Sequence, residues 1–550
     1  MPTIQCSFTD LKDLYGKKCS LDELRQWLPA AKAELEHYDE KTDTLTIKLG
    51  DTNQPYLWSV EGITRFLRHY QGNERGIPRI KMMKTKNIIS VDPKLHSIRP
   101  VIAAFIAKGK PFTNYLLKQF IQMQEKIADG FGRRRQKVAI GMYPSSKISF
   151  PLRYYAADPE KTSFVPLDGT KENLRRILAY HPKGKEYAWI LQDAKQYPLL
   201  EDARRQIISF PPITNAEDTG RINIGDSSIF FEATGTDHAA VNLVTTIFAY
   251  AFAERGFSLQ QVSVKYHDKT ENTPLLKEEA VAITPEQVAA YLGIQLKKSE
   301  IKTLLERAQY DVLEKVKIPP YRGDILHPVD VIEDIGIMYG YDKIEPLPLT
   351  TSTVGAALPK IREIEKCREL LLGLGYQEVL SPVLSNKELL CDKMNTPDTG
   401  IVEIENFMSQ TYSAVRTWIL PVLLEMLSKN KHVDYPQRVF EQGIVTRRVG
   451  DMCNDEEHLA VVYCNTIADY TEMKQVMDYL FSMLGARCSI TSAEHPALIP
   501  GRVGDILVNR RKVGFLGELS PHVLEKLDIT MPAVCMELNL SVLFSLAKNS

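Results

Sequence analysis

Residues 320–341 read P-Y-R-G-D-I-L-H-P-V-D-V-I-E-D-I-G-I-M-Y-G-Y, and this segment joins a helix pattern to a cluster of acids. Pro328 lies where helices commonly begin, and Gly340 lies where they commonly end. Apolar residues recur between them at helical spacing, at Val331, Ile335 and Met338. The segment therefore predicts a helix with one apolar face.

The acids of this segment allow two interpretations. Asp330, Glu333 and Asp334 are three and four residues apart, so they share a face of the predicted helix. Asp324 precedes them in a loop that can fold back. Acids in a first turn complement the positive end of the helix dipole, whereas converging carboxylates suit Mg²⁺. The spacing leaves both open, and zinc is disfavoured because no cysteine joins and His327 stands alone.

Length and charge limit the class of protein. A chain of 550 residues predicts three or four domains. Apolar and charged contents of 44% and 25% are ordinary for a soluble globular protein. The net charge of −1 excludes a chain that binds nucleic acid through its overall charge, so any such contact must come from a local patch.

The cysteines and the apolar runs indicate a cytoplasmic protein without a membrane segment. The eight cysteines are scattered and form no C-x-x-C pair, which disfavours a zinc ribbon or a disulfide framework. The beginning of the chain has no signal-peptide pattern. The most apolar window, 241–253, is too short to cross a membrane and is expected to be a buried helix.

Periodicity predicts a multidomain chain that combines α+β and α/β folds. The four predicted domains are an N-terminal α+β module at 1–85, an α/β domain at 86–276, a helix-rich module at 277–346 and a final α/β domain at 355–550. Two short helices followed by a strand give the third module a winged-helix resemblance. Within the second domain, 187–191 is predicted as a strand after a loop at 181–185.

A second candidate site lies at 228–237, which reads S-I-F-F-E-A-T-G-T-D and ends a predicted strand just before the apolar helix. A helix N-terminus offers free N–H groups that suit an oxyanion or an ester. Alternatively, Thr236 or Asp237 only caps the helix. Glu232 follows three apolar residues and points either into a pocket or out of the sheet. The basic run at 132–137 either leads a solvated strand or contacts phosphate.

Several motifs in a fixed order carry a family resemblance. They are P-Y-R-x-D at 320–324 with the three helix acids and Y-G-Y at 339–341, F-P-P-I at 210–213, E-x-T-G-T-D at 232–237, H-P-K-G-K-x-Y at 181–187, Arg416 with Pro421 and Asn430, F-E-x-G at 440–443, P-G-R at 500–502, and G-E at 517–518 with Pro521. Each is weak alone. Together they resemble the β subunits of phenylalanyl-tRNA synthetase, of the shorter archaeal and eukaryotic kind.

The resemblance implies an (αβ)₂ heterotetramer that attaches phenylalanine to tRNA(Phe) with ATP. The α subunit would hold the synthetic site. The final domain of this chain would be a class II synthetase-like antiparallel-sheet domain without the ATP motifs. Its strand reads Val439-Phe440-Glu441, where the active fold carries Phe-Arg-x-Glu with an arginine that clamps phosphate.

The resemblance also implies that 86–276 hydrolyses tRNA mischarged with tyrosine. A pocket built for phenylalanine cannot strongly reject an isostere that adds a hydroxyl. A second site must therefore hydrolyse the mischarged tRNA. Glu232 would accept the phenolic O–H, and Thr234, Gly235 and Thr236 would surround the ester or ribose. Pro212 and Asn215 complete the candidate set. Without a Ser-His-Asp or Cys-His set, a positioned water is the expected nucleophile.

For the acidic segment, the resemblance implies Mg²⁺ held by Asp324, Asp330, Glu333 and Asp334. Because no synthetic machinery is expected in this chain, the ion would be a structural clip near the subunit junction. A magnesium-dependent phosphoesterase using the same acids is disfavoured, because no nucleophile lies nearby.

Two departures from the family pattern matter. The N-terminal module reads N-Q-P-Y-L at 53–57 where relatives read N-R-P-D-L. Tyr143-Pro144 stands where many relatives carry His-Asp. The second departure leaves an alternative open, in which the chain is a structural and tRNA-binding subunit that no longer edits.

Overall fold

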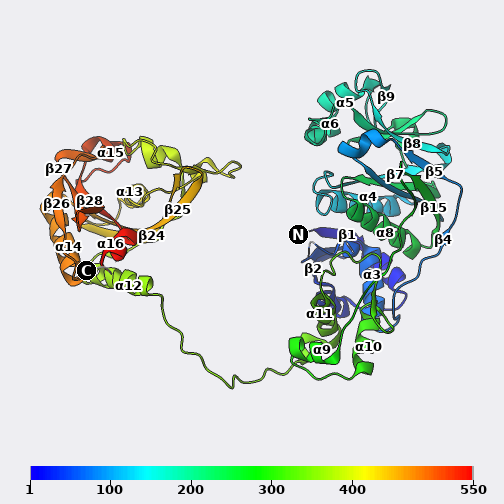
Figure 1. The fold of residues 1–550 in the computed structure, drawn as a ribbon, viewed down its shortest axis with the longest axis horizontal. Helices are drawn as coiled ribbons and strands as arrows, with labels where there is room; N and C mark the ends of the chain where they lie inside the picture. Colours follow the sequence, from blue (N-terminus) through cyan, green and yellow to red (C-terminus); the bar gives the residue numbers. More distant parts are fainter. Residues whose placement is uncertain (1, 52, 548–550) are drawn as a thin grey trace. The chain divides into compact units, whose positions relative to one another are not determined.

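The protein is described by a computed structural model that covers residues 2–51 and 53–547. The chain divides into two compact units, 1–348 and 349–550 (Figure 1). Both units mix helices and strands, which confirms the predicted class of a multidomain α and β protein.

The N-terminal module of the first unit packs helices on a small antiparallel sheet of order β1-β3-β2. Its elements are β1 (Thr3–Ser7), α1 (Phe8–Tyr15), α2 (Leu21–Trp27), β2 (Ala33–Asp39), β3 (Thr44–Leu49) and α3 (Val60–Tyr70). Ser20 and Glu23 form the capping box of α2, which satisfies free N–H groups at the helix start. Alternate residues of β3 are buried, as period-two burial requires.

A large sheet follows, with strand order β13-β12-β11-β8-β5-β15-β6-β14-β7 and with β4 and β16 paired to β15. The strands are β4 (Met82–Met83), β5 (Ile88–Val91), β6 (Val101–Lys108), β7 (Val138–Pro144), β8 (Leu152–Ala157), β11 (Tyr197–Glu201), β12 (Ile207–Phe210), β13 (Thr214–Asn215), β14 (Ser228–Gly235), β15 (Ser258–Lys265) and β16 (Thr270–Thr273). Helices α4 (Asn114–Asp129) and α8 (His238–Glu254) pack on it, α8 against β6 and β14. Strand β14 is therefore paired on both sides and buried.

A small subdomain around β9 (Ser163–Phe164) and β10 (Glu172–Asn173) contains α5 (Leu174–Tyr180), α6 (Pro182–Tyr187) and, further on, α7 (Glu217–Gly220). The predicted strand at 187–191 is wrong. His181 caps α6, Pro182 occupies its first turn, and a 3₁₀ turn at Ala188–Ile190 continues it. Proline at a first helical position favours the helix, and this signal overrode the apolar run.

The last module of the first unit carries β17 (Glu279–Val281), α9 (Pro285–Leu292), α10 (Lys298–Arg307), β18 (Asp311–Val312), β19 (Val316–Ile318) and α11 (Pro328–Tyr339). Helix α11 begins at Pro328 and is followed by Gly340, whose φ of 95° suits a residue without Cβ. The bounds predicted from residues 320–341 are thus confirmed.

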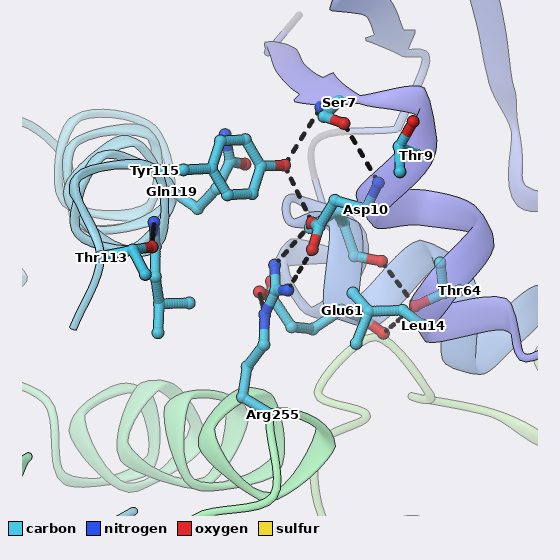
Figure 2. Close-up of polar contacts among 12 residues, drawn as sticks. Ser7, Thr9, Asp10, Leu14, Glu61, Thr64, Thr113, Tyr115, Gln119 and Arg255 are labelled. Carbon is cyan, nitrogen blue, oxygen red and sulfur yellow. Dashed lines mark hydrogen bonds and ion pairs between the residues drawn. The ribbon is translucent and has the colours of Figure 1, made fainter. Parts of the chain in front are cut away.

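Charged side chains join the N-terminal module to the helices of the large sheet (Figure 2). Arg255, just after α8, places Nε 2.6 Å from Glu61 of α3, and its two terminal nitrogens lie 2.5 and 2.9 Å from Asp10 of α1. Tyr115 of α4 donates to Asp10 and accepts from the amide of Ser7. One guanidinium therefore pairs with carboxylates from two helices.

The second unit is a seven-stranded sheet of order β20-β24-β25-β29-β28-β27-β26, antiparallel except for β20. Its strands are β20 (Gln377–Glu378), β24 (Gln437–Val449), β25 (Met452–Cys464), β26 (Ser489–Ser492), β27 (Leu498–Val508), β28 (Arg511–Leu519) and β29 (Ala533–Asn539), and a small sheet holds β21 (Leu384–Ser385), β22 (Val402–Glu403) and β23 (Ala414–Val415). The helices are α12 (Pro359–Gly373), α13 (Leu420–Lys429), α14 (Tyr470–Met483), α15 (Pro521–Lys526) and α16 (Leu540–Ala547). Across residues 2–51 and 53–547, no helix has the length and apolarity that a membrane crossing needs.

Candidate editing site

A cavity of about 320 Å³ opens in the first unit between β7, β14, the β12–β13 turn and the beginning of α6. Three of the six predicted editing residues line it: Pro212, Asn215 and Glu232. The cavity also takes polar side chains from other segments, among them Arg135 and His181. Residues from six separate segments of the chain thus meet around one space.

Glu232 faces this cavity because of its place in β14. Its neighbours Phe231 and Ala233 point to the α8 side of the sheet and join that core, so Glu232 points to the other side. In the paired strand β7, Gly141 lies opposite Glu232. A Cβ at Gly141 would come within 2.5 Å of Glu232 Oε1 and would overlap the hydroxyl of Tyr143. The glycine therefore provides the space that the carboxylate occupies.

The two oxygens of Glu232 have different environments. The hydroxyl of Tyr143 donates to Oε1 at 2.8 Å. Oε2 is buried and has no hydrogen-bond partner within the described part of the chain. Burial raises the pKa of Glu232 to about 7, although the bond from Tyr143 and the charge of Arg99 favour the ionised form. The carboxyl therefore combines a raised pKa with one buried oxygen that lacks a hydrogen-bond donor.

The structure does not bring Thr234, Gly235 and Thr236 into this cavity. Thr234 is fully buried, and both its hydroxyl and its carbonyl accept from Arg99. A Cβ at Gly235 would meet the carbonyl of Lys137. Thr236 is exposed and donates its amide to the same carbonyl at 3.2 Å. Packing and Arg99 already use Thr234 and Gly235, and the role of the three residues at the ester stays a prediction.

The beginning of α8 shows capping rather than a free anion site. The carboxylate of Asp237 accepts the amide of Ala240 at 2.9 Å and lies 3.2 Å from the ammonium of Lys137. Capping was one of the two interpretations of this segment. An acid at this position also repels a second anion.

The basic run contributes a wall residue that the sequence did not single out. Arg135 donates to the carbonyls of Pro212 and Ile213 at 3.1 and 3.0 Å, and its guanidinium stacks over Tyr187 at 4.2 Å. It therefore holds the β12–β13 turn at the cavity. Arg133 and Arg134 are exposed.

The four predicted magnesium ligands do not gather around a common point. The guanidinium of Arg322 lies between two of them, 2.7 Å from Asp324 and 2.9 Å from Asp334. Asp330 accepts the amides of Leu326 and His327, both at 2.7 Å, as a cap of α11. Their charges are thus already compensated within the chain.

Glu333, the fourth acid, pairs with Lys32 of the N-terminal module at 3.0 Å. Gln54 donates to Asp324 at 3.1 Å. Among residues 2–51 and 53–547, no group of three or more His, Cys, Asp or Glu side chains is arranged to hold a metal ion. The residues therefore do not fit a magnesium ion as they stand, and two of the acids, Glu333 and Asp324, instead contact the N-terminal module.

Two buried charged pairs lie inside the second unit. Arg416 and Glu441 form an ion pair at 2.6 Å, and both side chains are buried. Glu537 accepts the amide of Leu420 at the beginning of α13 at 2.9 Å and pairs with His458 at 2.7 Å. These groups support the fold of the sheet and leave no free arginine clamp among themselves.

Comparison with known proteins covers the whole chain. A sequence family described as "tRNA synthetase B5 domain" matches residues 281–341, and one described as "Phenylalanyl tRNA synthetase beta chain CLM domain" matches residues 345–540. The chain is 40% identical over 559 residues to the phenylalanine–tRNA ligase beta subunit of Pyrococcus horikoshii, covering 99% of this chain and 100% of that protein. It is 35% identical over 555 residues to the beta subunit of Archaeoglobus fulgidus, with 99% of each covered.

A solved structure agrees with this similarity. It is the N-terminal fragment of the phenylalanyl-tRNA synthetase beta subunit from Pyrococcus horikoshii, with 36% sequence identity and a TM-score of 0.60. The match covers 62% of this chain and 100% of the fragment.

Proposed function

This chain belongs to the family of phenylalanine–tRNA ligase beta subunits, and on that premise we propose that it works with an α subunit to attach phenylalanine to tRNA(Phe). The α subunit supplies the synthetic site and binds ATP with its Mg²⁺, in an (αβ)₂ assembly. The second unit is a class II synthetase-like scaffold. The internal pairing of Arg416 with Glu441 supports this, because the pair leaves neither residue to clamp phosphate.

We propose further that the cavity hydrolyses tRNA(Phe) mischarged with tyrosine. The observation that carries this proposal is the unpartnered Oε2 of the buried Glu232. A tyrosine side chain in the cavity can donate its phenolic O–H to Oε2. Phenylalanine would leave that oxygen desolvated and unpaired. Hydrogen bonds to charged groups contribute about 1.5–3 kcal/mol, which corresponds to roughly 10–150-fold discrimination.

The hydrolytic step needs a water molecule at the ester carbonyl. No described residue of the cavity forms a Ser-His-Asp or Cys-His set, and His181 already contacts the carbonyl of Leu167 at 2.8 Å. The protein's part is then to hold the tyrosyl group and to exclude phenylalanine, while tRNA hydroxyls orient the water. The exposed Arg133 and Arg134 are the proposed phosphate contacts of the tRNA.

The magnesium ion at the acidic segment stays a prediction of the family resemblance. For the chain alone, Arg322 already supplies the positive charge between Asp324 and Asp334. An ion there would have to displace that guanidinium. No step of the proposed activity depends on it.

The test uses the chain co-purified with a cognate α subunit. Phenylalanine charging should require both subunits, and charging by this chain alone would refute the assignment of synthesis to α. The complex should deacylate Tyr-tRNA(Phe), and Glu232→Gln should slow that reaction by about tenfold or more while charging is unchanged.

Glu201→Gln is a matched control. Glu201 also accepts from a tyrosine hydroxyl, that of Tyr155 at 3.0 Å, but it does not line the cavity. Equal rates for wild type and Glu232→Gln would remove Glu232 from the mechanism. Absence of deacylation in the wild-type complex would favour the alternative of a structural, tRNA-binding subunit without editing.

A further inference from the structure

Tyr143 holds the carboxylate on which the proposed editing depends. Its hydroxyl lies 2.8 Å from Glu232 Oε1, and its side chain is fully buried. In the β7–β14 pairing, Tyr143 lies opposite Phe230 while Gly141 lies opposite Glu232. Tyr143 and Glu232 therefore meet diagonally on the same face of the sheet.

We infer that Tyr143 is a specificity-determining positioning residue, which occupies Oε1 so that Oε2 is the acceptor presented to the substrate. This inference rests on the proposed editing function. On this reading the Tyr143 hydroxyl sets how the cavity distinguishes tyrosine from phenylalanine. A carboxylate free to rotate could turn either oxygen toward water or a neighbour, whereas a carboxylate held at Oε1 offers one oxygen in one direction.

Packing, local space and protonation state together keep the Tyr143 hydroxyl in place as a donor. Its ring packs on Phe230 with centroids 5.7 Å apart. Gly141 provides the space in which the two polar groups meet. Burial raises the pKa of Tyr143 well above its usual value, so the phenol remains protonated and acts as a donor.

These contacts do not match a Tyr143 that only blocks the cavity. Tyr143 bonds to Oε1 while Oε2 remains without a partner, and the ring belongs to the cavity wall. Tyr143 thus leaves Oε2, which is buried, without a hydrogen-bond partner. The phenol of the tyrosyl substrate then donates the second hydrogen bond, to Oε2.

Other ionisable groups that face Glu232 are few. Arg99 and Tyr154 interact electrostatically with it, and the cavity wall adds Arg135, Asp168, His181 and Lys183. None of these donates a hydrogen bond to Glu232. Tyr143 is therefore the neighbour whose removal changes the hydrogen bonding of Glu232 directly.

The test is Tyr143→Phe, which deletes the hydroxyl and keeps the ring. In the complex with α, the ratio of Tyr-tRNA to Phe-tRNA deacylation should fall roughly tenfold, and the pH midpoint of Tyr-tRNA deacylation should move upward. In a Glu232→Gln background the same substitution should have little further effect, because both act through one carboxylate. Tyr155→Phe, which removes the analogous donor to Glu201, should change neither quantity.

Two results would overturn the inference. Faster Tyr-tRNA deacylation by Tyr143→Phe would show that Tyr143 obstructs the site. An unchanged ratio and unchanged pH midpoint would show that it is a packing residue.

An infrared titration of the chain without substrate separates this inference from the proposed activity. The protonated carboxyl band of Glu232, assigned by its loss in Glu232→Gln, should titrate at higher pH in Tyr143→Phe. A missing shift sinks the positioning role even if editing occurs. If the wild-type complex does not deacylate Tyr-tRNA but the Glu232 band still shifts in Tyr143→Phe, the editing proposal is refuted and the positioning of Glu232 by Tyr143 is retained.

Discussion

Replacing Arg255 with methionine should destabilise the first unit strongly. Arg255 is 11% exposed at its side chain and pairs with Asp10, 18% exposed, and with Glu61, 3% exposed (Figure 2). Methionine keeps most of the apolar stem but leaves two carboxylates from α1 and α3 without their cation. Removing one partner of a buried ion pair typically costs about 3–5 kcal/mol, since an uncompensated charge remains buried.

The size of the first unit sets the expected thermal shift. With about 2.1 cal/mol/K of unfolding entropy per residue, 348 residues give roughly 0.7 kcal/mol/K. A loss of about 3–5 kcal/mol then lowers the midpoint of this unit by about 4–7 °C. Differential scanning calorimetry of the whole chain measures the shift, and the transition of the second unit should not move.

Two comparisons sharpen this prediction. Arg25→Met breaks the exposed pair with Asp22, at 56% and 84% exposure, and should lower the midpoint by no more than about 1 °C. Adding Asp10→Asn and Glu61→Gln to Arg255→Met should recover more than half of the loss, because no buried charge is then left. A shift below 1 °C for Arg255→Met, or one equal to that of Arg25→Met, would refute the reasoning.

Three further predictions concern the cavity and the acidic segment. Gly141→Ala should slow Tyr-tRNA deacylation as much as Glu232→Gln, because the new Cβ overlaps Tyr143 and Glu232; a normal rate in a kinetic assay would contradict the crowding. The folded-state pKa of Glu232, about 7 against an unfolded value near 4.5, means that the native state binds more protons between these values. Wild-type stability should therefore fall between pH 5 and pH 8 by up to about 3 kcal/mol relative to Glu232→Gln, and urea unfolding at both pH values tests the sign. Magnesium in place of a chelator should leave the melting midpoint of the isolated chain unchanged, whereas a ligand at 100 times its Kd would add about 2.7 kcal/mol, and a rise of that size would show that the ion binds despite Arg322.

Local rules predicted the elements whose signals lie within a few residues. The bounds of α11 follow from Pro328 and Gly340, and the box that begins α2 follows from Ser20 and Glu23. These signals act over one helical turn, since capping satisfies N–H groups only three or four residues away. The strand predicted at 187–191 failed where two local signals competed and the helix start at Pro182 was stronger.

The tertiary structure alone decided which charged and polar groups compensate one another. The spacing of Asp324, Asp330, Glu333 and Asp334 placed acids on one helix face. It could not show that Lys32, some 300 residues earlier, pairs with Glu333, or that Arg322 turns back between Asp324 and Asp334. A carboxylate pairs with whatever cation the fold brings within reach, and chain distance does not limit that choice.

For the cavity, too, the sequence predicted single residues and the fold decided their contacts. The sequence singled out Glu232 and the unusual Tyr143 as separate features. Only the register of β7 against β14 brings the hydroxyl to Oε1, and only burial leaves Oε2 without a partner. Thr234 lies on the same side of the strand as Glu232, but its hydroxyl and carbonyl accept hydrogen bonds from Arg99. A buried guanidinium needs such acceptors. The sequence by itself therefore determined the family and the acid of the proposed site, and strand pairing and burial decided which of its neighbours act with it.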